Sequence, residues 1–402
     1  MFKNINCKNL PSLRRNIVYQ FLYELLIVFI PLFTIPYVSR VLGAENIGLF
    51  SYTYAVANYF VLFANLGIKN YGSRTIAMVR NNKEELNRNF SEILSIHIIF
   101  SIIVIFVYLV LLFFFVEDNL VIFLIQSIYV FAAVFDINWF FFGIEKFKLT
   151  VGRNTLVKIL SVFLVLVFVK TQTDLWIYAL ILALSVFVGQ SVVWFALKQY
   201  VSWRRPSWAN MKQHIRPLFV LFLPILALSL YKYMDKIMLG SISSNVQVGF
   251  YENAEKIINV PMSLIMAFGV VLMPRIANMV TSKDKGEVFK LIDMSMEAVM
   301  LLAIAISFGL AGISFVLAPI FFGYEFEECG ILIMGLAVTV PFMAFANVIR
   351  TQYLIPYKED KIFVVSLFLG AAVNLIVNII LIPYMAARGA VIGTIFAEII
   401  VC

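Results

Sequence analysis

Charged side chains interrupt two otherwise apolar stretches in the second half of the chain. The residues are Lys232, Asp235 and Lys236 in the first stretch and Glu252, Glu255 and Lys256 in the second. Their spacing of i, i+3 and i+4 places each trio on one face of a helix. Because an ionised side chain deep in a bilayer costs about 2.5–3.5 kcal/mol on lenient insertion scales, such faces should meet a partner or a hydrated cavity. The chemistry indicated is binding of an anionic or zwitterionic ligand.

Depth in the helix separates these residues into two groups. For Lys236 and Glu252, extension of the side chain to the membrane interface is an equally good interpretation. Lys232 lies about 12 Å before the expected helix end near Gly240, and Glu255 lies about 9 Å after Gly249. At that depth, an ion pair between neighbouring helices or a hydrated cavity is favoured, and the cavity is the leading hypothesis.

The first apolar segment carries a further candidate cavity carboxylate, Glu24. Pro31 and Pro36 follow it, and each removes a backbone donor, so this helix is expected to bend around a lumen. The alternative is a carboxylate held by tyrosine or backbone groups in a packed interior.

Arginines at expected helix ends are candidates for binding a diphosphate, because a guanidinium offers forked hydrogen bonds to phosphate oxygens. They are Arg40, Arg74, Arg275 and Arg350. For the last three, retention of positive charge on one side of the membrane is the competing explanation. Arg40 lies on the opposite side, which is poor in basic residues.

A carboxylate and an aromatic ring lie one turn apart near the end of the fourth apolar segment, at Asp136 and Trp139. Together they could contact a sugar. The more ordinary role of such a tryptophan is anchoring at the membrane interface.

The composition indicates that these residues lie in a membrane. Of the 402 residues, 62% are hydrophobic and 13% charged, and 39 are phenylalanine, more apolar surface than a soluble domain can hide. Unbroken apolar runs such as 98–116 exclude the alternating strands of outer-membrane barrels. The two histidines and three cysteines lack the spacing of a metal site or a disulfide framework, so neither a metal nor a cofactor is expected.

Segments of about 20 apolar residues, the length that crosses a bilayer, predict an all-α protein of about twelve transmembrane helices. The predicted spans are 17–39, 47–68, 90–116, 120–142, 154–169, 175–197, 217–240, 249–273, 291–322, 329–349, 362–382 and 389–402. The last is short, so the chain either ends in a short helix or is truncated. We expect two six-helix lobes, 1–200 and 217–402, joined by a cytoplasmic linker, 201–216.

The basic residues orient the helices, because Lys and Arg are retained on the cytoplasmic side. Most of the 31 basic residues lie in alternate connections, before residue 17 and within 69–88, 146–158, 198–216, 275–290 and 350–361. The opposite connections contain only Arg40, Lys170 and Arg388. Both termini are therefore expected in the cytoplasm, and the net charge of +8 needs no nucleic acid to explain it.

An internal repeat supports the two-lobed arrangement. Residues 48–52 (GLFSY) recur as 249–253 (GFYEN), an offset of 201 residues, and Arg74, Met78 and Val79 recur at the same offset as Arg275, Met279 and Val280. Six intervening helices give the two copies the same orientation, and transporters commonly bind substrate between such halves. Chance coincidence in leucine-rich helices is the alternative.

Several motifs together resemble one transporter family. They are residues 35–43 (IPYVSRVLG), Gly48, Leu66-Gly67, residues 71–74 (YGSR), residues 136–145 (DINWFFFGIE) and residues 235–240 (DKIMLG). In these residues the chain resembles Wzx-type O-antigen and capsule flippases, the polysaccharide transport branch of the multidrug/oligosaccharidyl-lipid/polysaccharide exporter superfamily. No single motif is diagnostic, but the resemblance spans the chain.

That resemblance implies a V-shaped, alternating-access transporter in the bacterial inner membrane. Its cargo would be undecaprenyl-diphosphate-linked oligosaccharide repeat units, moved from the cytoplasmic to the periplasmic leaflet, and its partners a polysaccharide polymerase and a chain-length regulator. Glu24 or Glu255 is a candidate for coupling to protons. A small-molecule cation antiporter of the same superfamily is the nearest alternative. A membrane glycan polymerase is disfavoured, because the outer connections leave no room for an active site.

Overall fold

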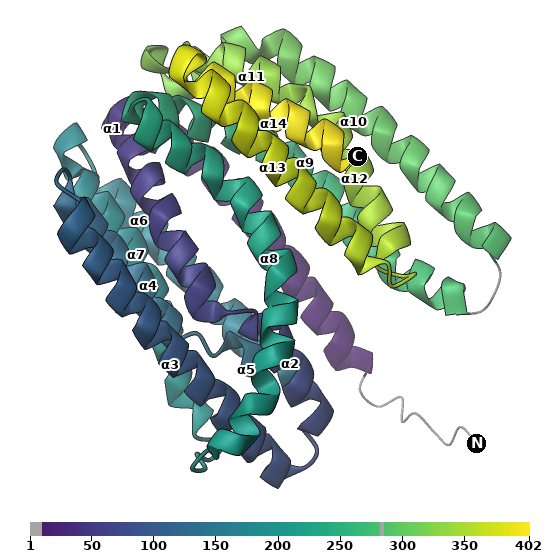
Figure 1. The fold of residues 1–402 in the computed structure, drawn as a ribbon. Helices are drawn as coiled ribbons and strands as arrows, with labels where there is room; N and C mark the ends of the chain where they lie inside the picture. Colours follow the sequence, from purple (N-terminus) through teal and green to yellow (C-terminus); the bar gives the residue numbers. More distant parts are fainter. Residues whose placement is uncertain (1–9, 282–284) are drawn as a thin grey trace. The chain divides into compact units, whose positions relative to one another are not determined.

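The computed structural model describes residues 10–281 and 285–402, and within them it contains helices and no strands (Figure 1). In chain order the α-helices are α1 (Leu10–Asn65), α2 (Ile68–Val79), α3 (Lys83–Phe115), α4 (Leu120–Val134), α5 (Asn138–Gly143), α6 (Phe147–Phe168), α7 (Leu175–Leu197), α8 (Trp208–Ile242), α9 (Asn245–Thr281), α10 (Lys285–Phe322), α11 (Cys329–Ala337), α12 (Thr339–Val348), α13 (Asp360–Met385) and α14 (Ala387–Val401). Short turns η2 (Gln172–Asp174) and η3 (Tyr324–Phe326) and the π-helix η4 (Ile349–Leu354) complete the set.

Apolar helices of membrane-spanning length dominate this part of the chain. Nine helices among the described residues are long and apolar enough to cross a bilayer. Large apolar side chains such as Phe113 and Phe308 point outward, as expected where the solvent is lipid. The predicted all-helical membrane class is confirmed, and about twelve crossings are consistent with the helices observed.

A single glycine divides α1 into two helices. Gly43 has φ 78° and ψ 172°, a conformation that glycine adopts readily and other residues resist. The predicted segments 17–39 and 47–68 lie on either side of it. Next to this corner, the Glu325 carboxylate accepts a hydrogen bond from the Ala44 N–H at 2.8 Å, which satisfies a donor in the first turn of the second helix.

The predicted segment 120–142 is broken rather than continuous. Helix α4 ends at Val134 and α5 begins at Asn138. In the break, the Asp136 carboxylate accepts hydrogen bonds from the backbone and side-chain amides of Asn138, at 3.0 and 2.7 Å. An aspartate that bonds a backbone N–H two residues later favours a turn over a helix.

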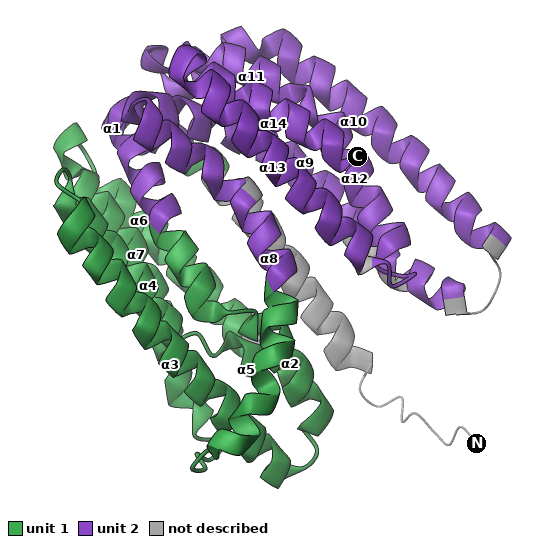
Figure 2. Cartoon of the chain, viewed as in Figure 1, with its two compact units in different colours: residues 1–34, 57–222 green, residues 35–56, 223–402 purple. Residues whose placement is uncertain are grey.

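The described helices fall into two compact units (Figure 2). Of the described residues, one unit comprises 10–34 and 57–222, and the other comprises 35–56, 223–281 and 285–402. Helix α8 therefore contributes its first half to one unit and its second half to the other. The division into functional lobes at 200 and 217 stays a prediction.

Two glycines of the sequence repeat meet inside the second unit. A methyl group on Gly48 would collide with the Asn245 carbonyl, and one on Gly249 would collide with the Ala44 carbonyl. The second half of α1 and the start of α9 thus approach through backbone atoms, as small residues allow in membrane helices.

We expect Gly249→Ala to destabilise the protein by about 1–3 kcal/mol, the usual cost of overpacking. Gly309→Ala is the matched control, because no atom lies within 4 Å of the added methyl there and alanine favours the helix. Thermal unfolding in detergent measures both variants. Equal melting temperatures would show that the two helices do not approach this closely.

Candidate functional site

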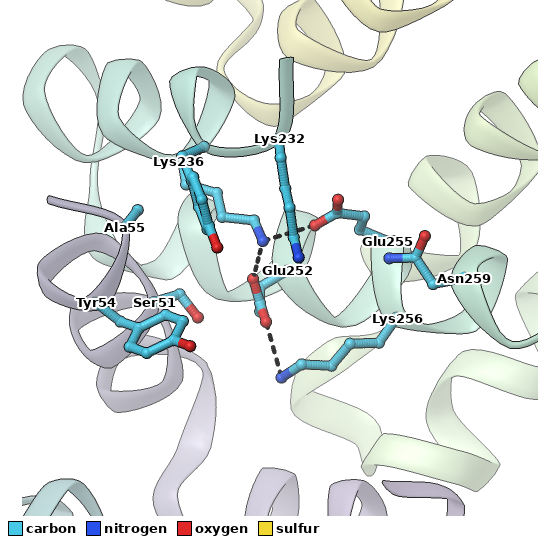
Figure 3. A pocket seen from close by; sticks show the side chains of 10 residues that line it. Ser51, Tyr54, Ala55, Lys232, Lys236, Glu252, Glu255, Lys256 and Asn259 are labelled. Atoms are coloured by element: carbon cyan, nitrogen blue, oxygen red, sulfur yellow. Dashed lines mark ion pairs between the residues drawn. The ribbon is translucent and has the colours of Figure 1, made fainter. Parts of the chain in front are cut away.

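A cavity of about 230 Å³ lies within the second unit, between the second half of α1 and the helices α8 and α9 (Figure 3). Its lining residues are Ser51, Tyr54, Ala55, Lys232, Tyr233, Lys236, Glu252, Glu255, Lys256 and Asn259. The cavity therefore brings together five charged side chains that the sequence places on two separate helices.

Lys236 is the centre of an ion-pair network in this cavity. Its Nζ lies 2.6 Å from Glu252 Oε2 and 2.7 Å from Glu255 Oε2. The other oxygen of Glu252 lies 3.1 Å from Lys256 Nζ, one turn along α9. Lys236 is only 7% exposed, so it is held inside the protein by two carboxylates rather than extended to the membrane interface.

Lys232 has a different environment from Lys236, although both project from α8 into the cavity (Figure 3). The Lys232 side chain is exposed, and its ammonium lies 5.5 Å from the centre of the Tyr233 ring. Among the described residues it forms no ion pair. Three lysines and two glutamates line the cavity, so Lys232 supplies the positive charge that no described carboxylate compensates.

Neutral polar groups complete the wall. The hydroxyl groups of Ser51 and Tyr54 come from α1, and the Asn259 amide comes from α9. Ser51 and Tyr54 were not predicted to line the cavity, because neither side chain carries a charge. The repeat offset of 201 residues contained the signal, because it pairs Ser51 with Glu252 and Tyr54 with Glu255.

Asp235 does not line the cavity. It is 3% exposed, and its carboxylate accepts hydrogen bonds from the Tyr251 hydroxyl at 2.6 Å, the Asn378 amide at 2.5 Å and the Thr394 hydroxyl at 2.9 Å. These partners belong to α9, α13 and α14. The carboxylate thus ties α8 to three neighbouring helices.

The arginines predicted at helix ends are not gathered at the cavity. Arg40 donates a hydrogen bond to the Ile320 carbonyl at 2.5 Å, near the end of α10. The Arg350 guanidinium lies 4.4 Å from the centre of the Phe363 ring. Arg74 on α2 and Arg275 on α9 are exposed. Diphosphate binding by any of the four stays a prediction.

The remaining candidates lie elsewhere. Asp136 occupies the break between α4 and α5. Trp139 is 2% exposed and stacks on Phe90, with ring centres 5.6 Å apart. The hypothesis of an aromatic sugar platform is therefore wrong, and so is that of an interface anchor, because the ring is enclosed in the core. The side chain of Glu24 lies outside the described residues.

Comparisons with known proteins agree with this architecture. Residues 13–280 match the family described as "Polysaccharide biosynthesis protein". The chain is 24% identical to a putative O-antigen transporter of Shigella dysenteriae, over 97% of this chain and 98% of that protein. It is 26% identical to a putative O-antigen transporter of Escherichia coli (strain K12), over 98% and 95%. A solved lipid II flippase MurJ has a similar fold, with a TM-score of 0.76 and 14% identity, over 96% of this chain and 85% of that structure.

Membrane-spanning helices with a charged internal cavity define a multi-pass membrane protein, and its fold is similar to that of the MurJ structure. The match over residues 13–280 covers well over half of the chain. The chain belongs to the polysaccharide biosynthesis protein family.

Proposed function

We propose that this chain translocates lipid-linked oligosaccharides across the inner membrane. The cargo is an undecaprenyl-diphosphate-linked repeat unit for O-antigen or a related surface polysaccharide, moved from the cytoplasmic to the periplasmic leaflet. The observation that carries the proposal is the cavity with one uncompensated lysine and a neutral polar wall. Similarity to two putative O-antigen transporters over nearly the full length supports it.

The cavity chemistry suits the head of such a cargo. Lys232 offers an ammonium group to a diphosphate oxygen, a charge-assisted hydrogen bond of the stronger kind. Ser51, Tyr54 and Asn259 offer hydroxyl and amide groups to sugar hydroxyls. The volume of 230 Å³ is below the roughly 300–1,000 Å³ typical of ligand pockets, so the cavity holds part of the headgroup while the polyprenyl tail stays in lipid.

The two alternative functions fit less well. A cation antiporter needs a cavity dominated by carboxylates, whereas here lysines outnumber glutamates. A polymerase needs an outer domain, whereas only residues 116–119 separate α3 from α4 and only 323–328 separate α10 from α11. We therefore propose transport without catalysis. We further propose that both termini lie in the cytoplasm, as the distribution of basic residues indicates, and that a polymerase and a chain-length regulator act downstream.

Deletion of the gene tests the proposal. The strain should accumulate lipid-linked repeat units in the cytoplasmic leaflet, because the glycan is assembled there and has no route across. Leaflet assignment by a membrane-impermeant glycan-modifying reagent, applied to spheroplasts and to lysed membranes, measures this. Unpolymerised units already on the periplasmic leaflet would point to a polymerase, and an unchanged lipid-linked pool would overturn the proposal.

A further inference from the structure

The connection between α7 and α8, residues 198–207, is unusual in what it exposes. Trp203 is 56% exposed, and Trp208, the first residue of α8, is 60% exposed. Neither indole lines the cavity. Tryptophan is enriched where one end of the side chain meets lipid and the other meets water, so two such rings within six residues require an explanation.

Hydrogen bonds to α3 hold this connection in place. The Ser202 N–H donates to Asn87 Oδ1 at 3.0 Å, and the Arg204 N–H donates to Ser91 Oγ at 2.9 Å. Asn87 and Ser91 are buried, and so is Val201. The backbone is therefore fixed while the tryptophans are presented outward.

The same surface is strongly basic. No acidic residue lies between Asp174 and Asp235. The exposed basic residues are Lys198, Arg204, Arg205, Lys212 and Arg216. Arg204 has a partner in Glu84 at 3.2 Å, but the other four form no ion pair with any described residue. Four positive charges are left to attract an anionic surface.

Two candidate membrane spans place this surface at the edge of the bilayer. One ends at Leu197 and the next begins at Trp208. Along α8, Trp208, Lys212 and Arg216 follow one another at intervals of four residues, which places them on one side of the helix over about 12 Å. Exposed Phe219 and Val220 come next. The order is that of a phospholipid, with charge at headgroup depth and apolar surface at acyl depth.

We propose that Trp203, Arg205, Trp208, Lys212 and Arg216 form a docking surface for anionic phospholipids. The basic side chains bind headgroup phosphates, and the indoles lie in the headgroup region beside them. The short connection between two candidate spans brings this basic and aromatic surface to the depth of the lipid headgroups. This surface acts independently of the transported substrate.

Fluorescence quenching by brominated lipids tests the proposal in the full-length chain. The background variant Trp176→Phe removes the third strongly exposed tryptophan, 49% exposed, and leaves Trp139 in the core and the half-buried Trp194. The protein is placed in phosphatidylcholine nanodiscs that contain the same mole fraction of brominated phosphatidylglycerol or brominated phosphatidylcholine. Brominated phosphatidylglycerol should quench more strongly, because it concentrates beside Trp203 and Trp208.

Charge variants identify the source of that preference. Arg205→Gln with Lys212→Gln should weaken the preference for phosphatidylglycerol about fivefold per charge removed, the equivalent of about 1 kcal/mol for each basic residue near an anionic surface. Lys290→Gln with Lys361→Gln removes the same charge from exposed positions on α10 and α13 and should leave the preference intact. Equal quenching by the two lipids, or an equal loss in both double variants, would overturn the proposal.

Discussion

Lys232→Ala is expected to abolish surface polysaccharide while the protein still inserts and folds. The side chain is exposed to the cavity and forms no ion pair with the described residues, so its loss leaves no buried charge behind. A hydrogen bond to a charged group contributes about 1.5–3 kcal/mol, which corresponds to roughly a 10- to 150-fold loss of transport. Complementation of a deletion strain, with glycan and protein both quantified, measures the effect.

The controls for this prediction separate charge from shape. Lys232→Arg keeps the positive charge and should retain partial transport. Lys361→Ala removes an exposed lysine far along the sequence, on α13, and should complement fully. If Lys232→Ala also complements fully, Lys232 is not the anion-binding group and the assignment of the cavity fails.

Lys236→Met is expected to act through stability instead. Removing the lysine leaves Glu252 and Glu255 without the ammonium that lies 2.6 and 2.7 Å from them. Breaking a buried ion pair in this way costs about 3–5 kcal/mol, a large fraction of the stability of a typical protein. We expect a marked fall in melting temperature and in the amount of protein recovered from membranes.

A compensated variant makes this second prediction specific. Lys236→Met combined with Glu255→Gln removes one charge of each sign, leaves the ion pair between Glu252 and Lys256 in place, and should recover most of the lost stability, because a neutral amide costs less to bury than an unpaired carboxylate. The purified variants are heated, and size-exclusion chromatography then measures how much of each remains folded. A single variant as stable as the unchanged chain would show that the network is not a buried ion pair.

The two lysines of α8 have different environments although they lie on the same helix. Lys232 and Lys236 are one turn apart and face the same cavity, but only Lys236 lies within reach of both glutamates of α9. The sequence spacing is identical for either role. The position of the neighbouring helix decides which lysine is neutralised and which one remains available to a ligand.

Asp235 also shows that spacing along a helix does not determine the environment of a side chain. The i, i+3, i+4 pattern groups Asp235 with Lys232 and Lys236, but adjacent residues of a helix project about 100° apart. With a neighbouring helix on each side, Lys236 reaches the cavity while Asp235 reaches Asn378 and Thr394 on α13 and α14. A helical pattern specifies a face about this wide, and it does not specify which neighbour covers each edge.

The membrane class, the helical segments and the two charged faces can be read from the residues alone, because hydrophobic length and the cost of intramembrane charge act locally along the chain. Three other outcomes required the packed helices: Trp139 lies in the core, Asp235 turns away from the cavity, and Ser51 and Tyr54 enter it. Each of these depends on contacts between helices distant in sequence. Such contacts are set by side-chain packing, which the spacing of residues along the sequence does not specify.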